Sequence, residues 1–362
     1  MNNRLFVDFH VLQTVPPSCV NRDDTGRPKT AMYGGTPRAR VSSQCSKRGI
    51  SQYFMAHFPE YSVGERTRHV RDLLTDNILI LDPSMDEEKA NEKAKKALEK
   101  LGLKGETAAD QEKDKGKDKD QNTLYFVTTD QIKALAEVAV SGETQKAKYI
   151  EALNSKPSID MVMFGRMIAS EPSLNYDATV QVAHSISTHT VHNEFDFFTA
   201  IDDEDPYKRA GHLNTTEFNS STLYRFATMN IADFWKFDDY HSAEAVTAFA
   251  KAFVYSMPTG KINTFANFTL PDDVYITVRT DQPVNLCGAF ERPVRSKGEG
   301  YVEPSEQAFT DYTKKIYANF SGDPIAAFGA GTGMAALADT KPMPQVFDNL
   351  QNCLDEILRS QK

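Results

Sequence analysis

Positive charge is concentrated in one segment near the N-terminus. Between residues 25 and 50 the chain carries six basic residues and no acidic residue, and the six are Arg27, Lys29, Arg38, Arg40, Lys47 and Arg48. Glycines in the same segment let the backbone approach a ligand closely. This combination predicts a partner rich in phosphate, with a solvated basic loop as the alternative. The glycine patterns typical of nucleotide sites do not occur in the chain.

A helix is expected directly after this segment. It begins near Ser42 or Ser43, which are both good N-cap residues, and ends before Pro59. The N-terminus of a helix presents free amides and a partial positive charge to an anion. Because Lys47 and Arg48 fall close to that end, a phosphate there would meet amides, hydroxyls and cations together.

Two aspartates in the basic segment have the right chemistry for a metal-dependent reaction. Asp23 and Asp24 could bind a divalent ion that promotes RNA cleavage. They stand between Arg22 and Arg27, however, which favours charge balance or the hydrogen bonds of a turn. No serine or cysteine nucleophile lies in a recognisable motif. We therefore assign no catalytic residue.

Three histidines lie close together in the sequence. His184, His189 and His192 straddle the end of an expected strand and do not share one helical face. The pattern of a zinc protease helix is absent from the chain. We therefore expect no metal ion and no cofactor.

Two further places combine apolar and polar side chains in a suggestive way. Phe195, Phe197 and Phe198 crowd into one polar stretch. They would either anchor that stretch to the core or form a wedge or stacking platform for bases. Arg166 and Met167 follow an apolar run, where the plain interpretation is a surface arginine beside a buried methionine.

Hydrophobic periodicity places these residues on a set of elements. Strands are expected at residues 4–12, 159–165, 178–187, 221–231 and 274–279. Helices are expected at 42–58, 62–80, 86–102, 130–140, up to 153, and at 242–257, where Ser242 is the cap. A loop is expected from Pro16 to Pro37, and residues 188–220 lack clear periodicity. A loop as long as the latter is usually functional. Strands interleaved with helices predict an α+β domain of ferredoxin-like type.

Composition bounds the class of protein. The chain has 362 residues, with 40% hydrophobic and 25% charged residues, as in soluble globular proteins. Its net charge of −9 shows that the basic segment is a local feature. The 4 cysteines form no C-x-x-C pair, which argues against a disulfide framework or a zinc ribbon. No signal peptide or membrane span is recognisable, so we expect a cytoplasmic protein with no membrane partner.

Several separated segments together carry a resemblance to a known family. They are FHVLQTVPPSCVNRDDTGRPKTAMYGGTPRARVSSQCSKR near the N-terminus, FGRM (164–167), VAHSISTH (182–189), DFFTAIDD (196–203) and TTEFNSSTLYRFATMNI (215–231). In order and spacing the chain resembles the CasC or Cse4 family, the backbone subunit of type I-E CRISPR Cascade. The resemblance covers most of the chain and lapses in the charged insertion and near the C-terminus.

The resemblance implies an α+β architecture with three parts. A modified ferredoxin-like palm of the RNA-recognition type would comprise residues 1–60 and 155–362, including a long thumb loop at 188–220. A helical finger insertion would comprise residues 61–154. The charged linker at 102–121 is too polar to bury a surface and is expected to be flexible.

The resemblance also implies a set of functional residues. The RNA-binding residues would be Arg22, Lys29, Arg40, Ser42, Gln44, Lys47, Arg166 and Met167. Phe197 and Phe198 would form an apolar wedge on the thumb.

The implied function is a non-catalytic subunit that polymerises along the spacer of a CRISPR RNA (crRNA), kinks it periodically and presents it for pairing with target DNA in antiviral defence. Its partners would be the crRNA, the paired target strand, other copies of itself and the remaining Cascade subunits. Those subunits are the large, small, 5′-handle-binding and repeat-processing ones. One alternative is a metal-dependent endoribonuclease that uses Asp23 and Asp24. Another is a freestanding, monomeric module that binds single-stranded nucleic acid.

Overall fold

The structure, a computed structural model, describes residues 4–103, 124–201, 204 and 210–360. The chain divides into two compact units. The sheet unit comprises Met1–Phe54 and Val180–Lys362, and the helical unit comprises Met55–Thr179. None of the described helices is both long enough and apolar enough to span a membrane.

The division differs from the predicted one at both boundaries. Residues 155–179, which were expected in the palm, belong to the helical unit. The predicted linker at 102–121 lies outside the described residues from residue 104 onward.

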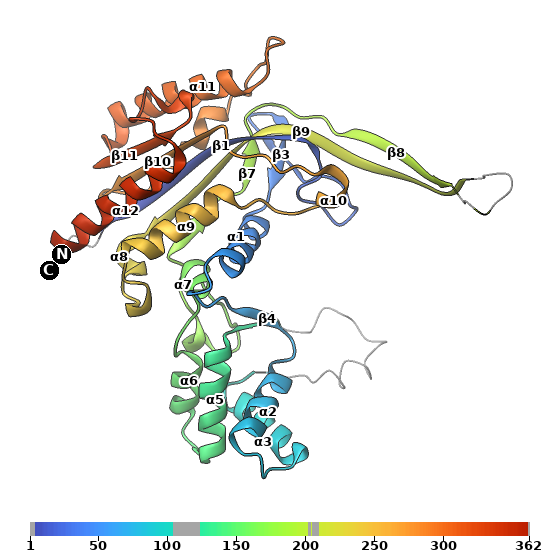
Figure 1. Cartoon of the computed structure of the whole chain (residues 1–362), viewed down its shortest axis with the longest axis vertical. Coiled ribbons are helices and arrows are strands. Elements are labelled where there is room, and N and C mark those ends of the chain that lie inside the picture. The colour runs from blue at the N-terminus through green and yellow to red at the C-terminus, as the bar shows by residue number, and fades with distance from the viewer. Residues whose placement is uncertain (1–3, 104–123, 202–203, 205–209, 361–362) are drawn as a thin grey trace. The chain divides into compact units, whose positions relative to one another are not determined.

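The sheet unit contains a 9-stranded sheet whose main path runs in the order β11-β10-β1-β9-β7-β3-β2, with β6 and β8 also paired to β9 (Figure 1). The strands are β1 Phe6–Ser18, β2 Thr30–Tyr33, β3 Thr36–Val41, β6 Val180–Val182, β7 Ser185–Ser187, β8 Glu194–Ile201, β9 Ala210–Asn230, β10 Asp273–Arg279 and β11 Ala326–Ala330. The helices are α1 Ser43–His57, α8 Ile231–Phe234, α9 Ala243–Tyr255, α10 Ile262–Phe265, α11 Val302–Ile316 and α12 Met343–Ser360. Short 3₁₀ or π turns occur at Asp238–Tyr240, Leu286–Phe290, Tyr317–Ser321 and Thr332–Met334.

The predicted α+β class is confirmed, and the connectivity is that of a ferredoxin-like palm. The order β1, α1, β7, β9, α9, β10 is a βαββαβ unit. In the sheet, β1 and β9 lie between β10 and β7, and these neighbours are antiparallel. The helical unit begins in the last turn of α1 and ends directly before β6, so it is an insertion into the palm.

Helices cover both faces of the central strands. Successive side chains of a strand point to opposite faces. The Phe9 ring lies 5.3 Å from Phe249 of α9, whereas the His10 ring lies 5.7 Å from Phe309 of α11. Strand β1 is therefore buried on both faces, and the apolar alternation expected over residues 4–12 describes one face only. Figure 1 shows α9 and α11 on opposite sides of the sheet.

Two predicted features of the sheet unit are wrong. The second half of the loop expected from Pro16 to Pro37 is a hairpin, in which Gly34 and Gly35, with φ of 57° and 75°, join β2 to β3. Two consecutive residues at positive φ make the type I′ turn that suits the twist of paired strands. The strand expected at 178–187 is split into β6 and β7, which both pair with β9.

The stretch from residue 188 to residue 220 is a projecting hairpin and not an unstructured loop. Strand β8 pairs with the first part of β9, which continues into the central sheet, and Figure 1 shows the ribbon extending beyond that sheet. Strand β8 has no buried face, because Glu194 to Ala200 are all exposed. The alternation that marks a half-buried strand therefore has no physical basis here.

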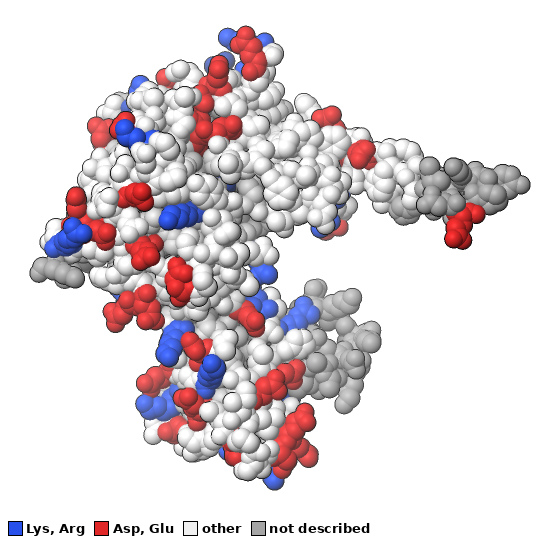
Figure 2. Space-filling model, viewed as in Figure 1, with Lys and Arg blue, Asp and Glu red and all other residues white. Residues whose placement is uncertain are grey.

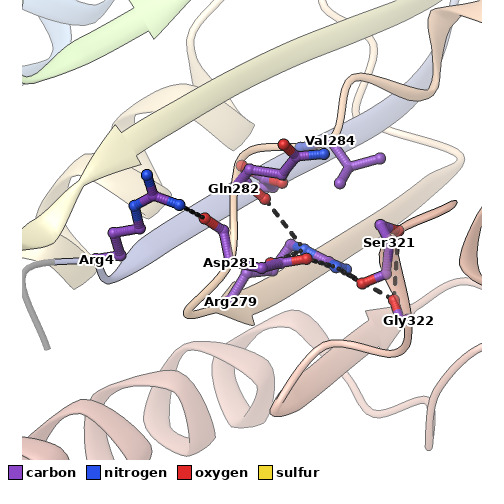
Figure 3. Close-up of polar contacts among 8 residues, drawn as sticks. Arg4, Arg279, Asp281, Gln282, Val284, Ser321 and Gly322 are labelled. Atoms are coloured by element: carbon purple, nitrogen blue, oxygen red, sulfur yellow. Dashed lines mark hydrogen bonds and ion pairs between the residues drawn. The ribbon is translucent and has the colours of Figure 1, made fainter.

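A buried guanidinium group, that of Arg279, lies at the C-terminal end of β10. Arg279, 1% exposed, is bonded to Asp281 by its Nη2 at 2.7 Å and its Nε at 2.9 Å. Nη2 also lies 3.0 Å and 3.1 Å from the carbonyl oxygens of Ser321 and Gly322 (Figure 3). This network joins the end of β10 to the turn that follows α11.

The helical unit contains the predicted helices with two differences: the first part of the helix expected at 62–80 is a short strand, and the strand expected at 159–165 is a helix. Its elements are β4 Glu65–Thr67, α2 Val70–Leu81, α3 Glu87–Lys100, β5 Tyr125–Val127, α5 Thr129–Ser141, α6 Lys146–Leu153, α7 Ile159–Phe164 and a 3₁₀ turn at Pro172–Leu174. The strand expected at 159–165 is helix α7. Its residues from Ile159 to Met163 are all buried, and a short run buried on every side has no period from which to choose.

One carboxyl group lies inside the sheet without a cationic partner in direct contact. Asp8 of β1 stands opposite Thr228 of β9 and Thr277 of β10. Its Oδ2 accepts a hydrogen bond of 2.8 Å from the backbone amide of Val284. Burial raises the pKa of the Asp8 carboxyl from 3.8 to about 6.

Replacing Asp8 with asparagine should remove a pH-dependent loss of stability. The pKa of Asp8 is higher in the folded chain than in the unfolded chain. Its contribution to the free energy of unfolding is therefore fully present below pH about 4 and is lost as the pH rises through about 6. The difference between a pKa of 3.8 in the unfolded chain and one of about 6 in the folded chain corresponds to about 3 kcal/mol of stability. Urea unfolding at several pH values should show that the difference in free energy of unfolding between the natural chain and Asp8→Asn changes by roughly that amount. A difference that is constant with pH would contradict the assignment.

Candidate nucleic-acid interface

A tight turn presents the first basic residue of the candidate interface. Asp23 Oδ1 accepts hydrogen bonds from the Thr25 amide at 2.9 Å, the Thr25 hydroxyl at 2.8 Å and the Arg27 amide at 2.9 Å. These bonds, led by that of the Thr25 hydroxyl, lower the pKa of Asp23. Arg27 Nε lies 2.7 Å from Glu217 Oε1, which fastens the turn to β9. Arg22, at the start of the turn, is exposed.

The role of Asp23 in this turn bears on the nuclease alternative. One of its two carboxylate oxygens already accepts three hydrogen bonds. Within the described residues, no group of three or more His, Cys, Asp or Glu is placed to hold a metal ion. The geometry around Asp23 and Asp24 thus gives the endoribonuclease interpretation no support, and the absence of catalysis stays a prediction.

Helix α1 begins where the sequence predicts, with Ser42 as its N-cap. The Ser42 hydroxyl accepts a hydrogen bond of 3.4 Å from the Cys45 amide, and the Ser42 amide donates to Asn21 Oδ1 at 2.9 Å. Ser42 itself is buried, whereas Gln44 is exposed and Lys47 half-buried. The first turn of α1 contains no acidic residue, so nothing there opposes an anion at the positive end of the helix.

A cavity of about 590 Å³ opens between the turn, α1 and the loop after α9. Its cationic side chains are Arg22, Arg48 and Lys261, and its acidic ones are Asp23 and Asp24. Three cationic side chains against two carboxylates leave the cavity with more positive than negative charge. A phosphate group is the ligand that this chemistry favours.

Lys261 is the cavity residue that sequence reasoning missed. It follows Gly260, where a Cβ atom would lie 2.1 Å from the carbonyl oxygen of Val20, so only glycine permits this approach. Lys261 has φ of 47°, and its Nζ donates to Thr216 Oγ1 of β9 at 2.9 Å. The available signal was the Pro-Thr-Gly-Lys turn directly after the helix predicted at 242–257.

Lys29 and Arg40 lie on a smaller depression beside the cavity, which shares Asn21 with it. Arg40 Nη1 lies 3.1 Å from His184 Nδ1, and Arg40 Nε donates to the Thr30 carbonyl at 3.3 Å. Burial, followed by the charges of Arg40 and Lys29, lowers the pKa of His184. A neutral imidazole whose Nδ1 accepts a hydrogen bond from Arg40 fits this arrangement. The structure therefore brings Arg22, Lys29 and Arg40 together on one side of the sheet unit.

Arg38 belongs to the same basic run but has a different role. Its side chain is fully buried. Nη1 donates to the carbonyls of Ser187 and Thr188 at 2.9 Å and 3.1 Å, and Nη2 donates to those of Phe290 and Glu291 at 2.9 Å and 3.3 Å. Arg38 is consequently part of the core, and the charge available at the surface is smaller than the sequence suggests.

The histidine group does not form a metal site. His189 Nε2 accepts a hydrogen bond from the Thr222 amide at 3.1 Å, and its Nδ1 lies 2.9 Å from the Thr190 carbonyl. Its ring stacks on Tyr301 with centroids 3.6 Å apart. Both ring nitrogens of His189 are thus engaged by the backbone, and the residue packs the start of the hairpin against the loop before α11.

The hairpin presents aromatic rings to solvent. Phe195 and Phe197 share one face of β8 and are 67% and 65% exposed, while Phe198 on the other face is 43% exposed. In the view of Figure 2 most of the described hairpin surface carries no charged side chain. Exposed rings gathered on a projecting element mark an interaction surface.

The broad face of the sheet cannot take the role it has in RNA-recognition domains. In those domains, aromatic side chains on the open sheet face stack on bases. Here the corresponding aromatic row of Phe226, Tyr275 and His10 is buried, and Phe309 of α11 packs on it. The candidate interface therefore consists of the cavity, the neighbouring depression and the hairpin.

In the helical unit, the expectation of a surface arginine beside a buried methionine is reversed, because Arg166 is buried and Met167 is exposed. Arg166 is 4% exposed and donates to the Leu174 and Leu153 carbonyls at 2.8 Å and 3.2 Å. It also donates to Gln131 Oε1 at 3.2 Å and Asn154 Oδ1 at 2.8 Å. Burial lowers the pKa of Arg166 to about 10.

Met167, in contrast, is 84% exposed. The preceding Arg166 holds the turn from inside, through paired backbone bonds of 3.1 Å and 2.9 Å with Tyr176 and through its guanidinium. A direct contact between Arg166 and RNA is not supported by this arrangement, whereas Met167 remains available for one.

The fold and this surface define an α+β protein of ferredoxin-like topology with a cationic cavity and a projecting aromatic hairpin. The chain matches the CT1975-like protein family over residues 7–356, and it belongs to that family. A search among curated proteins found no match.

Two solved structures are similar over nearly the whole chain. A chain described as "CRISPR RNA-guided surveillance complex, pre-nicking" has a TM-score of 0.79 and 30% identity, and the match covers 96% of this chain and 99% of that chain. A second, described as "CRISPR RNA-guided surveillance complex", has a TM-score of 0.73 and 26% identity with the same coverage. These likenesses support a CRISPR-associated protein.

Alanine substitutions at Arg166 and Met167 should separate stability from surface function. Arg166→Ala leaves several buried acceptors without a donor. We therefore expect the free energy of unfolding of the helical unit to fall by about 2–4 kcal/mol. Met167→Ala removes an exposed side chain and should change stability by less than about 0.5 kcal/mol. Thermal and urea unfolding measure both. Equal stability of the two variants would show that the guanidinium does not hold this turn.

Proposed function

We propose that this protein is a guide-RNA-binding subunit of a CRISPR RNA-guided surveillance complex and that it does not itself cut RNA. The observation that carries the proposal is the combination on one unit of a cationic cavity with a projecting aromatic hairpin. Single-stranded nucleic acid is bound by such combinations, in which cations follow the backbone and aromatic rings meet the bases. The likeness to chains of surveillance complexes supports the same conclusion.

In this proposal several copies bind side by side along the crRNA. The exposed rings of Phe197 and Phe198 act as a wedge between adjacent bases, and the segments between wedges pair with target DNA. The other subunits of a Cascade complex complete the assembly. The exposure of these rings supports the proposal, because large apolar side chains exposed on a projecting strand mark an interaction surface.

The cavity supplies the first test. Replacing Arg22, Arg48 and Lys261 together with alanine should weaken the binding of single-stranded RNA and reduce its salt dependence. Each lost phosphate contact lowers the slope of log K against log salt by about 0.7, so the triple variant should lose about 2. Fluorescence titration at several salt concentrations gives this slope.

A matched control for this test is available in the same unit. Lys236, Lys297 and Lys341 are exposed and lie outside the cavity, so their triple alanine variant changes the net charge equally. Its slope should stay close to that of the natural chain. Equal slopes in the two triple variants would show that the cavity does not hold phosphate. Magnesium-dependent cleavage of the RNA that disappears in Asp23→Ala would instead favour the endoribonuclease.

The hairpin supplies the second test. Phe197→Ala combined with Phe198→Ala should leave the melting temperature unchanged, because both rings are exposed, yet weaken guide-bound assembly. Base–aromatic contacts contribute about 1–3 kcal/mol each. Chemical probing of the bound RNA should show the nucleotide at the wedge becoming more protected. A large fall in melting temperature would place the rings in the core and rule out the wedge.

A further inference from the structure

The segment that follows Lys261 exposes two large apolar side chains. Phe268 is 80% exposed and Leu270 is 70% exposed. Both lie in the loop between α10 and β10, and α10 is held near the base of the hairpin by a ring contact between Phe265 and Phe218, whose centroids are 5.9 Å apart. The loop therefore begins at the cationic cavity and continues into an apolar surface.

This loop is fixed in place, although its side chains are exposed. Gln13 Nε2 donates to the Thr269 carbonyl at 2.8 Å, so the residue between Phe268 and Leu270 is attached to β1. The Asp272 amide donates to the Leu12 carbonyl at 2.9 Å, and Asp272 Oδ2 accepts from the Thr14 amide at 2.7 Å. The fixed backbone thus presents Phe268 and Leu270 as an exposed apolar surface, called the shelf below.

The loop departs from local rules at several neighbouring positions. Lys261 and Ala266, on either side of α10, both have φ of 47°, a left-handed conformation that non-glycine residues rarely adopt. Asn267 is 2% exposed, and neither Oδ1 nor Nδ2 of its amide has a hydrogen-bond partner. Backbone strain and unpartnered buried polar groups cluster where a segment is shaped for function and not for stability.

We propose that Phe268 stacks on an unpaired base and that Leu270 packs against it. The base belongs to the strand whose phosphate occupies the cavity of Arg22, Arg48 and Lys261. The inference rests on the proposed function and adds a base-contacting shelf to it. A cation at the start of the loop and an aromatic ring farther along it match a nucleotide, which joins an anionic phosphate to a flat apolar base. A protein partner would not require the adjoining positive charge, so the nucleobase is the occupant that this surface favours.

The test uses the full chain and a single-stranded RNA that carries 2-aminopurine, whose fluorescence falls when the base stacks. Phe268→Ala should weaken binding about tenfold and restore the fluorescence, with no change in the salt dependence, because no charge is lost. Phe268→Tyr should bind as the natural chain does. The matched control is Phe320→Ala, since Phe320 is 77% exposed in the same unit but lies in the turn after α11.

Each outcome decides the question. If the natural chain binds the RNA and Phe268→Ala binds it equally well, the shelf does not contact bases and only this inference fails. If Phe268→Ala instead alters self-association of the RNA-free protein in sedimentation, the shelf is a protein contact and the inference is overturned. If the natural chain does not bind single-stranded RNA, the proposed function fails and the shelf fails with it.

Discussion

A guanidinium group that leaves water must find acceptors for its N–H groups inside the fold. Arg38 meets this demand with two carbonyls at the end of β7 and with those of Phe290 and Glu291. Arg225 meets it with the Ser256 carbonyl at 2.9 Å, near the C-terminal end of α9. Backbone carbonyls that would otherwise be buried without a hydrogen-bond donor can therefore pack against the sheet. Arg38 thereby holds β3, and with it the β2–β3 hairpin, in place.

The same constraint separates the basic residues into two groups. Guanidinium groups that satisfy carbonyls, such as those of Arg38 and Arg279, are in the core and cannot meet a ligand. Arg22, Arg48 and Lys261 lack such a role and remain at the rim of a cavity. Since α11 covers the aromatic face of the sheet, that face is closed to a partner, whereas the rim of the cavity and the hairpin are open to one. The interface therefore differs in position from that of an open RNA-recognition sheet.

The sequence was informative where burial is one-sided and uninformative where it is not. The helix from residue 242 was predictable because Ser242 caps it, its hydroxyl accepting from the Ala245 amide at 3.1 Å. Helix α7 was mistaken for a strand because it is buried on every side, and β8 was missed because it is buried on none. Arg38 and Arg40 are indistinguishable in sequence, yet only the first is in the core. Lys261 lies far from the basic segment, so only the fold brings it to Arg22.

A net charge of −9 is compatible with this interface because binding responds to local charge. Counterions are released where cations meet phosphates, and acids elsewhere contribute little beyond the screening length of roughly 10 Å. In Figure 2 acidic and basic side chains are interspersed over the helical unit. On the face drawn, the interspersed charges form no continuous basic surface on this unit. In the proposed function, the local positive charge at the cavity attracts the phosphate, and the loop from Lys261 to Leu270 and the hairpin add apolar contacts.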